Sequence, residues 1–201
     1  MIVIGLGAGG CGLASLAHLL AAQEDSLVTK EIGIRTTGWR GSLFFELAQA
    51  EDWQQQLEVL GAKLAGDVGY YHLPYVYEIA KRHENCRIVW LGREKDKMIE
   101  CLLKGAAATH PWLEHLGDEW QWNPNNVTFP GLGVPNVKQA AAFYVDFYSR
   151  AATLISDCLG ERMRYFATRY LDSERGQTEI LKFLEVENPV TFSGGINVNP
   201  S

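Results

Sequence analysis

Features that are rare or missing in this sequence exclude whole classes of protein. No apolar run approaches the roughly 20 residues that a membrane-spanning helix needs. The cysteines are widely separated, and no Cys or His pair has the spacing of a metal site. Lys and Arg form no dense stripe and the formal net charge is −6, which argues against a general nucleic-acid binder. The expected partner is a small molecule, with no metal, nucleic acid or membrane.

The composition is that of an ordinary globular protein. A chain of 201 residues, 47% hydrophobic and 21% charged, suits one domain with a buried core. A strand-like stretch begins at residue 2, so we expect no signal peptide. For a chain without a signal peptide, we expect reduced cysteines and a cytoplasmic location. We predict a single domain over residues 1–201.

Strand-like and helix-like segments alternate along the chain. Apolar stretches predict strands at residues 2–4, 31–35, 67–72, 87–92 and 164–167. Amphipathic or capped segments predict helices at residues 13–22, 42–53, 54–65, 74–85, 96–104, 136–159 and 173–184. This alternation is typical of an α/β fold: an open, mainly parallel sheet with helices on both faces. Ligands bind such sheets beyond the carboxyl ends of the strands.

The most informative segment is a glycine-rich loop at residues 5–12, between a strand and a helix. Backbone N–H groups can approach an anion closely there, and the positive end of the helix dipole points at it. A nucleotide or phosphorylated ligand is therefore the first hypothesis, although a tight turn that brings helix and strand together gives the same pattern. Within the loop, Cys11 is either a thiol of lowered pKa near a helix N-terminus or a small residue that fills the turn.

Two further residues follow predicted strands. His72 can act as a general base near physiological pH, or it can be a packing histidine beneath the tyrosine rings that precede it. Arg93 can grip a phosphate with its guanidinium group, or it can be a solvated partner of nearby carboxylates.

The order of these elements resembles the sulfotransferase family. In that family a loop of the type Pro-Lys/Arg-Ser-Gly-Thr-Thr wraps the phosphosulfate, and Gly7-Ala8-Gly9-Gly10-Cys11-Gly12 takes its place here. A family segment Lys-Thr-His-Leu-Pro supplies a catalytic histidine, and Tyr70-Tyr71-His72-Leu73-Pro74 matches it from the histidine onward. The family holds the 3′-phosphate with an Arg after a strand and a Ser eight residues later. Arg93 and Cys101 stand at those positions. Residues 168–184 are similar to the closing segment of small bacterial members.

The resemblance implies a sulfotransferase-like, P-loop-like fold and an activity. The implied reaction moves a sulfuryl group from 3′-phosphoadenosine 5′-phosphosulfate, a co-substrate, to a hydroxyl or amine of a small-molecule or carbohydrate acceptor. His72 is the implied base, and no metal takes part. The implied nucleotide-binding residues are Gly7, Ala8, Gly9, Gly10, Cys11, Gly12 and Leu13 in the sulfate cradle, and Arg93 and Cys101 at the 3′-phosphate.

This sequence departs from the family pattern in the cradle. Ala8 stands where the family has a basic residue, and Cys11 and Gly12 replace its hydroxyl residues. A cation lost from such a site lowers the stabilisation of developing charge in the transition state. Lys30, Arg35 or Arg40 can replace the missing charge if the fold brings one of them to the loop. Catalysis is therefore expected to be impaired or altered.

Other functions stay open. Gly5-x-Gly7-x-x-Gly10 also matches the dinucleotide-binding fingerprint of NADP-linked or flavin oxidoreductases. That function needs an acidic residue at the end of the second strand, where the predicted strand ends at Arg35, a residue that suits a 2′-phosphate instead. A third possibility is a non-catalytic nucleotide-binding or scaffold protein.

The long loop predicted over residues 109–136 is rich in tryptophan, and in an enzyme it would cover the acceptor. Its aromatic faces suit sugars or apolar hydroxyl compounds, and they equally suit a sheet edge or a subunit contact. The residues concerned are Trp112, Trp120, Trp122 and Phe129.

Overall fold

The structure is a computed structural model that describes residues 1–31, 59, 61–105 and 136–196. Within these residues the chain forms a five-stranded sheet in the order β2-β3-β1-β4-β5, and every neighbouring pair is parallel. Residues 32–35 of the predicted second strand, the predicted helix at 42–53, half of the one at 54–65, the tryptophan-rich loop at 109–136 except Asn136, and Arg40 lie outside the described residues.

The central strands of the sheet are buried on both faces. The strands are β1 (Ile2–Leu6), β2 (Ser26–Lys30), β3 (Leu64–Val68), β4 (Cys86–Gly92) and β5 (Met163–Ala167). Every residue of β1 and β3 is buried, as continuous apolar strands of a parallel sheet are. The chain passes from one side of β1 to the other between β3 and β4, so β1 is the point where the strand order reverses.

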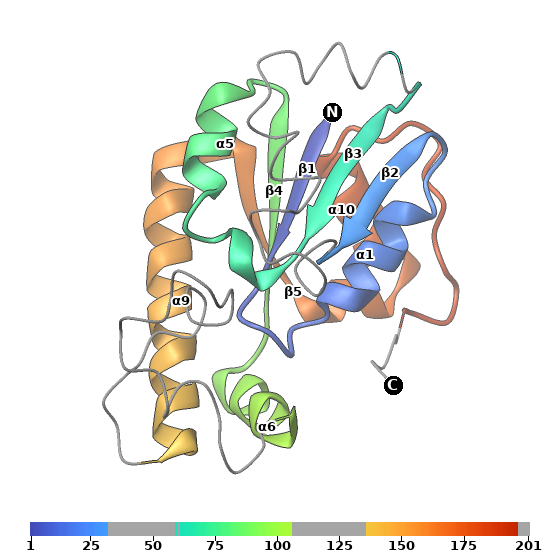
Figure 1. Ribbon diagram of the computed structural model, residues 1–201. Coiled ribbons are helices and arrows are strands. Elements are labelled where there is room, and N and C mark those ends of the chain that lie inside the picture. The colour runs from blue at the N-terminus through green and yellow to red at the C-terminus, as the bar shows by residue number, and fades with distance from the viewer. Residues whose placement is uncertain (32–58, 60, 106–135, 197–201) are drawn as a thin grey trace.

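Helices cover both faces of this sheet (Figure 1), and the predicted α/β class is confirmed. The described helices are α1 (Leu13–Ala21), α5 (Val76–Arg82), α6 (Lys95–Gly105), α9 (Val137–Leu159) and α10 (Glu174–Phe183), of which α6 lies beyond the end of the sheet, beside α9. The last two helices have side-chain N-caps: Asn136 accepts a hydrogen bond from the Gln139 amide, and Ser173 accepts one from the Gly176 amide. Among the described helices, none combines the length and the apolar composition that crossing a bilayer requires.

The structure corrects two predicted elements and adds a third. β2, at Ser26–Lys30, was not predicted, and of the strand predicted over 31–35 only Glu31 is described, directly after β2 and outside any strand. Leu64 and Ala65, predicted as the end of a helix, begin β3. The strand predicted over 67–72 ends at Val68, and Tyr70–His72 form a 3₁₀ turn. The prediction misplaced this strand because Gly66 and Asp67, in the middle of β3, have low strand propensity. The tyrosines that follow β3 have high strand propensity, although they form a turn.

Candidate active site

The glycine loop joins β1 to α1 at the carboxyl edge of the sheet. Gly9, Gly10 and Gly12 have φ values of 82°, 64° and 90°, a region that side-chain-bearing residues rarely occupy. At Gly10, an added Cβ would lie 2.6 Å from Cβ of Cys101, so the loop also packs closely against α6. Gly12 is the N-cap of α1 and has no side chain with which to satisfy the first helical amides. Those amides and the helix dipole favour an anion at this place.

Two side chains from distant parts of the chain hold the loop in shape. The hydroxyl of Tyr148, on α9, accepts a hydrogen bond from the Gly7 amide at 3.1 Å and donates one to the Tyr70 carbonyl at 3.0 Å. The hydroxyl of Thr168, just after β5, lies 2.8 Å from the Cys11 carbonyl and 3.1 Å from the Gly92 carbonyl. Sequence reasoning missed both residues, because neither belongs to a local motif.

A pocket of about 550 Å³ lies over this loop. Its lining includes six of the residues predicted to bind the nucleotide: Gly9, Gly10, Gly12, Leu13, Arg93 and Cys101. Residues that follow all five strands contribute to it, as expected for the carboxyl edge of a parallel sheet. The other predicted residues, Gly7, Ala8 and Cys11, are buried and are not among its described lining residues.

The pocket contains charges of both signs. Arg93 is exposed, and its guanidinium donates a hydrogen bond to the Gly10 carbonyl at 3.2 Å. Lys30, one of the residues considered as a substitute for the missing loop cation, also lines the pocket, with its ammonium 3.1 Å from the Glu31 carboxylate. Glu31 and Asp172 line the pocket as well. Two cations suit an anionic ligand, and carboxylates are acceptors for sugar hydroxyls.

Cys11 is an inert thiol. Its side chain is fully buried beneath the loop, and burial raises its pKa to about 12. The hypothesis of a reactive thiol at a helix N-terminus is therefore wrong, because the loss of solvation outweighs the nearby charge of Arg93. Its sulfur occupies the space that a side chain at Gly7 would need, so it fills the turn.

His72 belongs to a buried polar cluster centred on Asp67, which is fully buried in β3. Nε2 of His72 lies 2.8 Å from Oδ2 of Asp67, Thr29 donates to Oδ1 at 2.7 Å, and Tyr71 donates its hydroxyl proton to Oδ2. Burial alone would raise the pKa of Asp67, but the hydrogen bonds from His72, Tyr71 and Thr29 hold it below its ordinary value. Sequence reasoning missed Asp67, since a lone acid in a short strand carries no recognisable signal.

His72 is itself 4% exposed, and its ring packs 4.2 Å from the Tyr71 ring. It is not among the described residues that line the pocket over the glycine loop, although Tyr70, two residues before it, is one of them. Its role as a base stays a prediction. The cluster shows how the ring is held: a buried carboxylate fixes its orientation.

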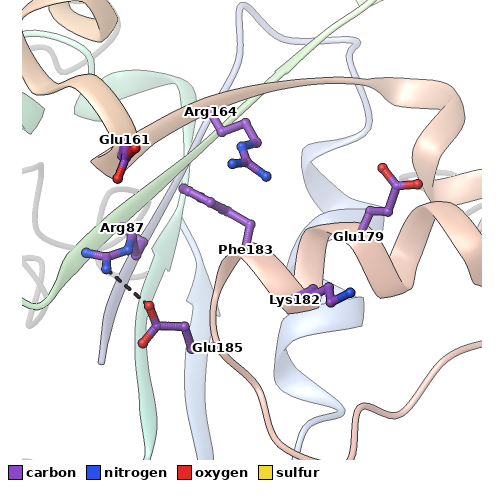
Figure 2. A pocket seen from close by; sticks show the side chains of 7 residues that line it. All are labelled: Arg87, Glu161, Arg164, Glu179, Lys182, Phe183 and Glu185. Carbon is purple, nitrogen blue, oxygen red and sulfur yellow. Dashed lines mark hydrogen bonds and ion pairs between the residues drawn. The ribbon is translucent and has the colours of Figure 1, made fainter.

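A second pocket, of about 500 Å³, lies where β4 and β5 begin, at the opposite edge of the sheet (Figure 2). Arg87 pairs with Glu185 at 3.2 Å, and the Arg164 guanidinium lies 4.9 Å from the centre of the Phe183 ring. Its described lining has three basic and three acidic side chains and, unlike the lining of the glycine-loop pocket, includes no residue of the glycine loop or of the start of α1, where backbone amides favour an anion. Among the described residues, no group of His, Cys, Asp and Glu side chains could hold a metal ion.

Comparison with known proteins supports the same fold. No protein-family model matches this sequence, and no curated protein matches it significantly. Among solved structures, the fold is similar to the crystal structure of a sulfotransferase from Alicyclobacillus acidocaldarius, with a TM-score of 0.61 and 14% sequence identity. The match covers 98% of this chain and 86% of that one. The class of protein that this defines is a sulfotransferase-like α/β fold, and at this identity the likeness concerns the fold alone.

Proposed function

We propose that this protein binds 3′-phosphoadenosine 5′-phosphosulfate in the pocket over the glycine loop and transfers its sulfuryl group to an acceptor. The observation that carries the proposal is the meeting of the glycine loop, Arg93 and Cys101 around one pocket. These residues lie far apart in the sequence, and the family resemblance assigns all of them to the same nucleotide. The sulfotransferase-like fold supports the same conclusion.

Each part of the pocket has a proposed role. The loop amides and the start of α1 hold the phosphosulfate, because both present N–H groups to an anion. Arg93 and Cys101 bind the 3′-phosphate. Lys30 supplies a cation where Ala8 supplies none. In the reaction, the acceptor oxygen forms a bond to sulfur, the bond from sulfur to the bridging phosphate oxygen breaks, and 3′-phosphoadenosine 5′-phosphate leaves.

The acceptor proton needs a base, and His72 remains the proposed one. Its hydrogen bond to Asp67 fixes the orientation of the ring. Exchange of His72 for Asn tests this role directly. A loss of kcat of about 100-fold with an unchanged affinity for the nucleotide supports a base, whose usual contribution is about 10²–10⁴-fold. A loss of thermal stability with little change in kcat contradicts it and leaves a packing role.

Isothermal calorimetry with 3′-phosphoadenosine 5′-phosphate tests the nucleotide assignment. We expect binding of this nucleotide and none of NADP. Arg93→Ala should weaken binding by about 10–100-fold, since a charge-assisted hydrogen bond contributes roughly 1.5–3 kcal/mol. Arg87→Ala is the matched control, because Arg87 lies in the pocket at the opposite edge of the sheet (Figure 2) and should leave the affinity unchanged. Equal effects of the two substitutions would remove Arg93 from the site.

An NADP-linked or flavin oxidoreductase is the second candidate, and one observation favours the flavin-dependent form over the NADP-linked one, because an acidic residue suits the free ribose hydroxyls of a dinucleotide and not a 2′-phosphate. Glu31 directly follows β2 and lines the pocket, so an acidic residue does stand at the end of the second strand. The strand order weighs against it: the usual dinucleotide-binding sheet places the second strand beside the first, whereas β3 lies beside β1 here. Tight binding of FAD or NADP in the same calorimetric experiment would select this candidate. Nucleotide binding without sulfuryl transfer to any acceptor would indicate a non-catalytic relative.

A further inference from the structure

A third pocket, of about 290 Å³, lies between α9 and the segment that carries His72. One wall comes from the 3₁₀ turn Tyr70–His72 and the start of α5, including Tyr70 and Tyr77. The other wall is the middle of α9, including Phe147, Tyr148 and Ile155. Its volume is close to the lower end of the range of roughly 300–1,000 Å³ that is usual for small-molecule sites.

This pocket adjoins the nucleotide pocket. Tyr70 lines both of them. Tyr148, which lines the third pocket, is also the residue that accepts a hydrogen bond from the Gly7 amide and donates one to the Tyr70 carbonyl. A ligand in the third pocket therefore lies against Tyr148, whose hydroxyl is bonded to the glycine loop, and against Tyr70, which also lines the pocket where the sulfuryl group would be held.

The chemistry of the lining selects the ligand. Every described side chain around the third pocket is aromatic or apolar, and none carries a charge. A sugar acceptor needs a partner for each of its many hydroxyls, and such a lining would leave most of them unsatisfied. A flat aromatic compound instead gains contact with tyrosine and phenylalanine rings. The volume admits one or two fused rings.

We propose that the third pocket receives the sulfuryl acceptor, and that this acceptor is a phenol of one or two rings. This inference rests on the proposed function. A phenolic hydroxyl has a pKa of about 10, so it gives up its proton far more readily than an aliphatic hydroxyl does. Such an acceptor suits a glycine loop that carries Ala8 in place of a cation. The phenol oxygen bonds to sulfur, its proton passes to the base, and 3′-phosphoadenosine 5′-phosphate departs.

Calorimetry with 2-naphthol on the nucleotide-free protein tests the pocket without requiring turnover. Ile155→Trp should fill the pocket and weaken 2-naphthol binding at least 10-fold. Leu154→Trp is the matched control, since Leu154 is 67% exposed and is not among the described lining residues, and it should change the affinity less than twofold. Ala151→Phe is a second filling variant at a partly buried lining position. Thermal melting and 3′-phosphoadenosine 5′-phosphate binding establish that each variant is folded.

Transfer assays then separate the two proposals. With radiolabelled 3′-phosphoadenosine 5′-phosphosulfate, we expect sulfated 2-naphthol and no sulfated glucosamine, and Ile155→Trp should raise KM for the phenol without changing nucleotide affinity. Absence of 2-naphthol binding, or binding that both tryptophan variants preserve, overturns the acceptor pocket while nucleotide binding still stands. Efficient transfer to glucosamine also overturns it. Phenol binding in a protein that binds no sulfonucleotide overturns the proposed function and the acceptor role together.

Discussion

Asp67 is the described residue whose surroundings constrain it most. Its carboxylate has no exposure and accepts hydrogen bonds from Thr29, Tyr71 and His72. A buried carboxylate is stable only when its partners replace the water it has lost. The three donors come from β2 and from the turn after β3, so the cluster ties that turn to the sheet.

Exchange of Asp67 for Asn should therefore destabilise the protein by about 3 kcal/mol at pH 7, the scale for breaking a buried charged network. Because the pKa of Asp67 is lower in the folded state, its contribution is present above the unfolded value of about 3.9. It is lost as pH falls through the lower folded value. Urea unfolding of both proteins between pH 3 and pH 7 measures the difference, which should shrink only in acid.

Asp146→Asn provides the control for this experiment. Asp146 pairs with Lys95 at 2.7 Å, but both side chains are about half exposed, and such a pair contributes roughly 0–1 kcal/mol. Equal losses in the two variants would show that the Asp67 network is no stronger than a surface ion pair.

At the scale of elements, the glycine loop depends on backbone shapes that only glycine adopts easily. Gly10→Ala should reduce nucleotide affinity at least 10-fold, because φ is 64° there and the new Cβ would meet Cβ of Cys101 at 2.6 Å. Gly160→Ala also places a side chain at a positive φ, of 57°, but nothing lies within 4 Å of its added Cβ. It should lower thermal stability by about 1 kcal/mol and leave nucleotide affinity unchanged. Calorimetry on both variants separates the effect of backbone strain on nucleotide affinity from the effect of displacing the glycine loop.

The elements also show what the sequence can and cannot predict. The glycine loop between β1 and α1, β4, α6 and α10 were predictable, because apolar runs, caps and glycine clusters are local signals. β3 was not, since a strand buried on both faces lacks alternation and this one contains Gly66 and Asp67. Gly66 is required because an added Cβ would collide with the Val3 carbonyl of the adjacent β1, a contact that only the folded sheet creates.

The long helix α9 illustrates a subtler limit. The sequence predicts an apolar side that includes Phe143, Phe147 and Leu154, but these are 61%, 49% and 67% exposed. The helix instead turns Tyr144, Tyr148 and small alanines toward the sheet. Periodicity identifies a helix with apolar faces, but it does not say which face meets the core when aromatic and small residues occur on both.

At the scale of the whole molecule, the parallel sheet itself assembles the candidate site. Lys30 ends β2, Tyr70 follows β3, Arg93 follows β4 and Thr168 follows β5, and all of them line the pocket over the loop that follows β1. A family resemblance pointed to Arg93 and Cys101, and both line this pocket, while their binding roles stay a prediction. Tyr148 and Thr168 could not be predicted, since their hydrogen bonds to the loop span 141 and 157 residues of chain.

Two of the four cysteines are buried and two are exposed, so their reactivity tests the fold of the intact protein. Cys11 and Cys86 are buried, and burial raises the pKa of each thiol to about 12, whereas Cys101 and Cys158 are exposed. Because the thiolate is the reactive form, two cysteines should react quickly with iodoacetamide in the folded protein and all four in urea.

Cys101 lines the nucleotide pocket and Cys158 is not among its described lining residues, which makes Cys158 an internal control. Saturating 3′-phosphoadenosine 5′-phosphate should slow labelling of Cys101 at least 10-fold and leave Cys158 unaffected, as peptide mass spectrometry would show. Arg93→Ala should remove this protection at the same nucleotide concentration, because Arg93 and Cys101 lie in the same pocket. Equal protection of both cysteines would indicate a global tightening of the fold, and no protection of either would place the nucleotide elsewhere.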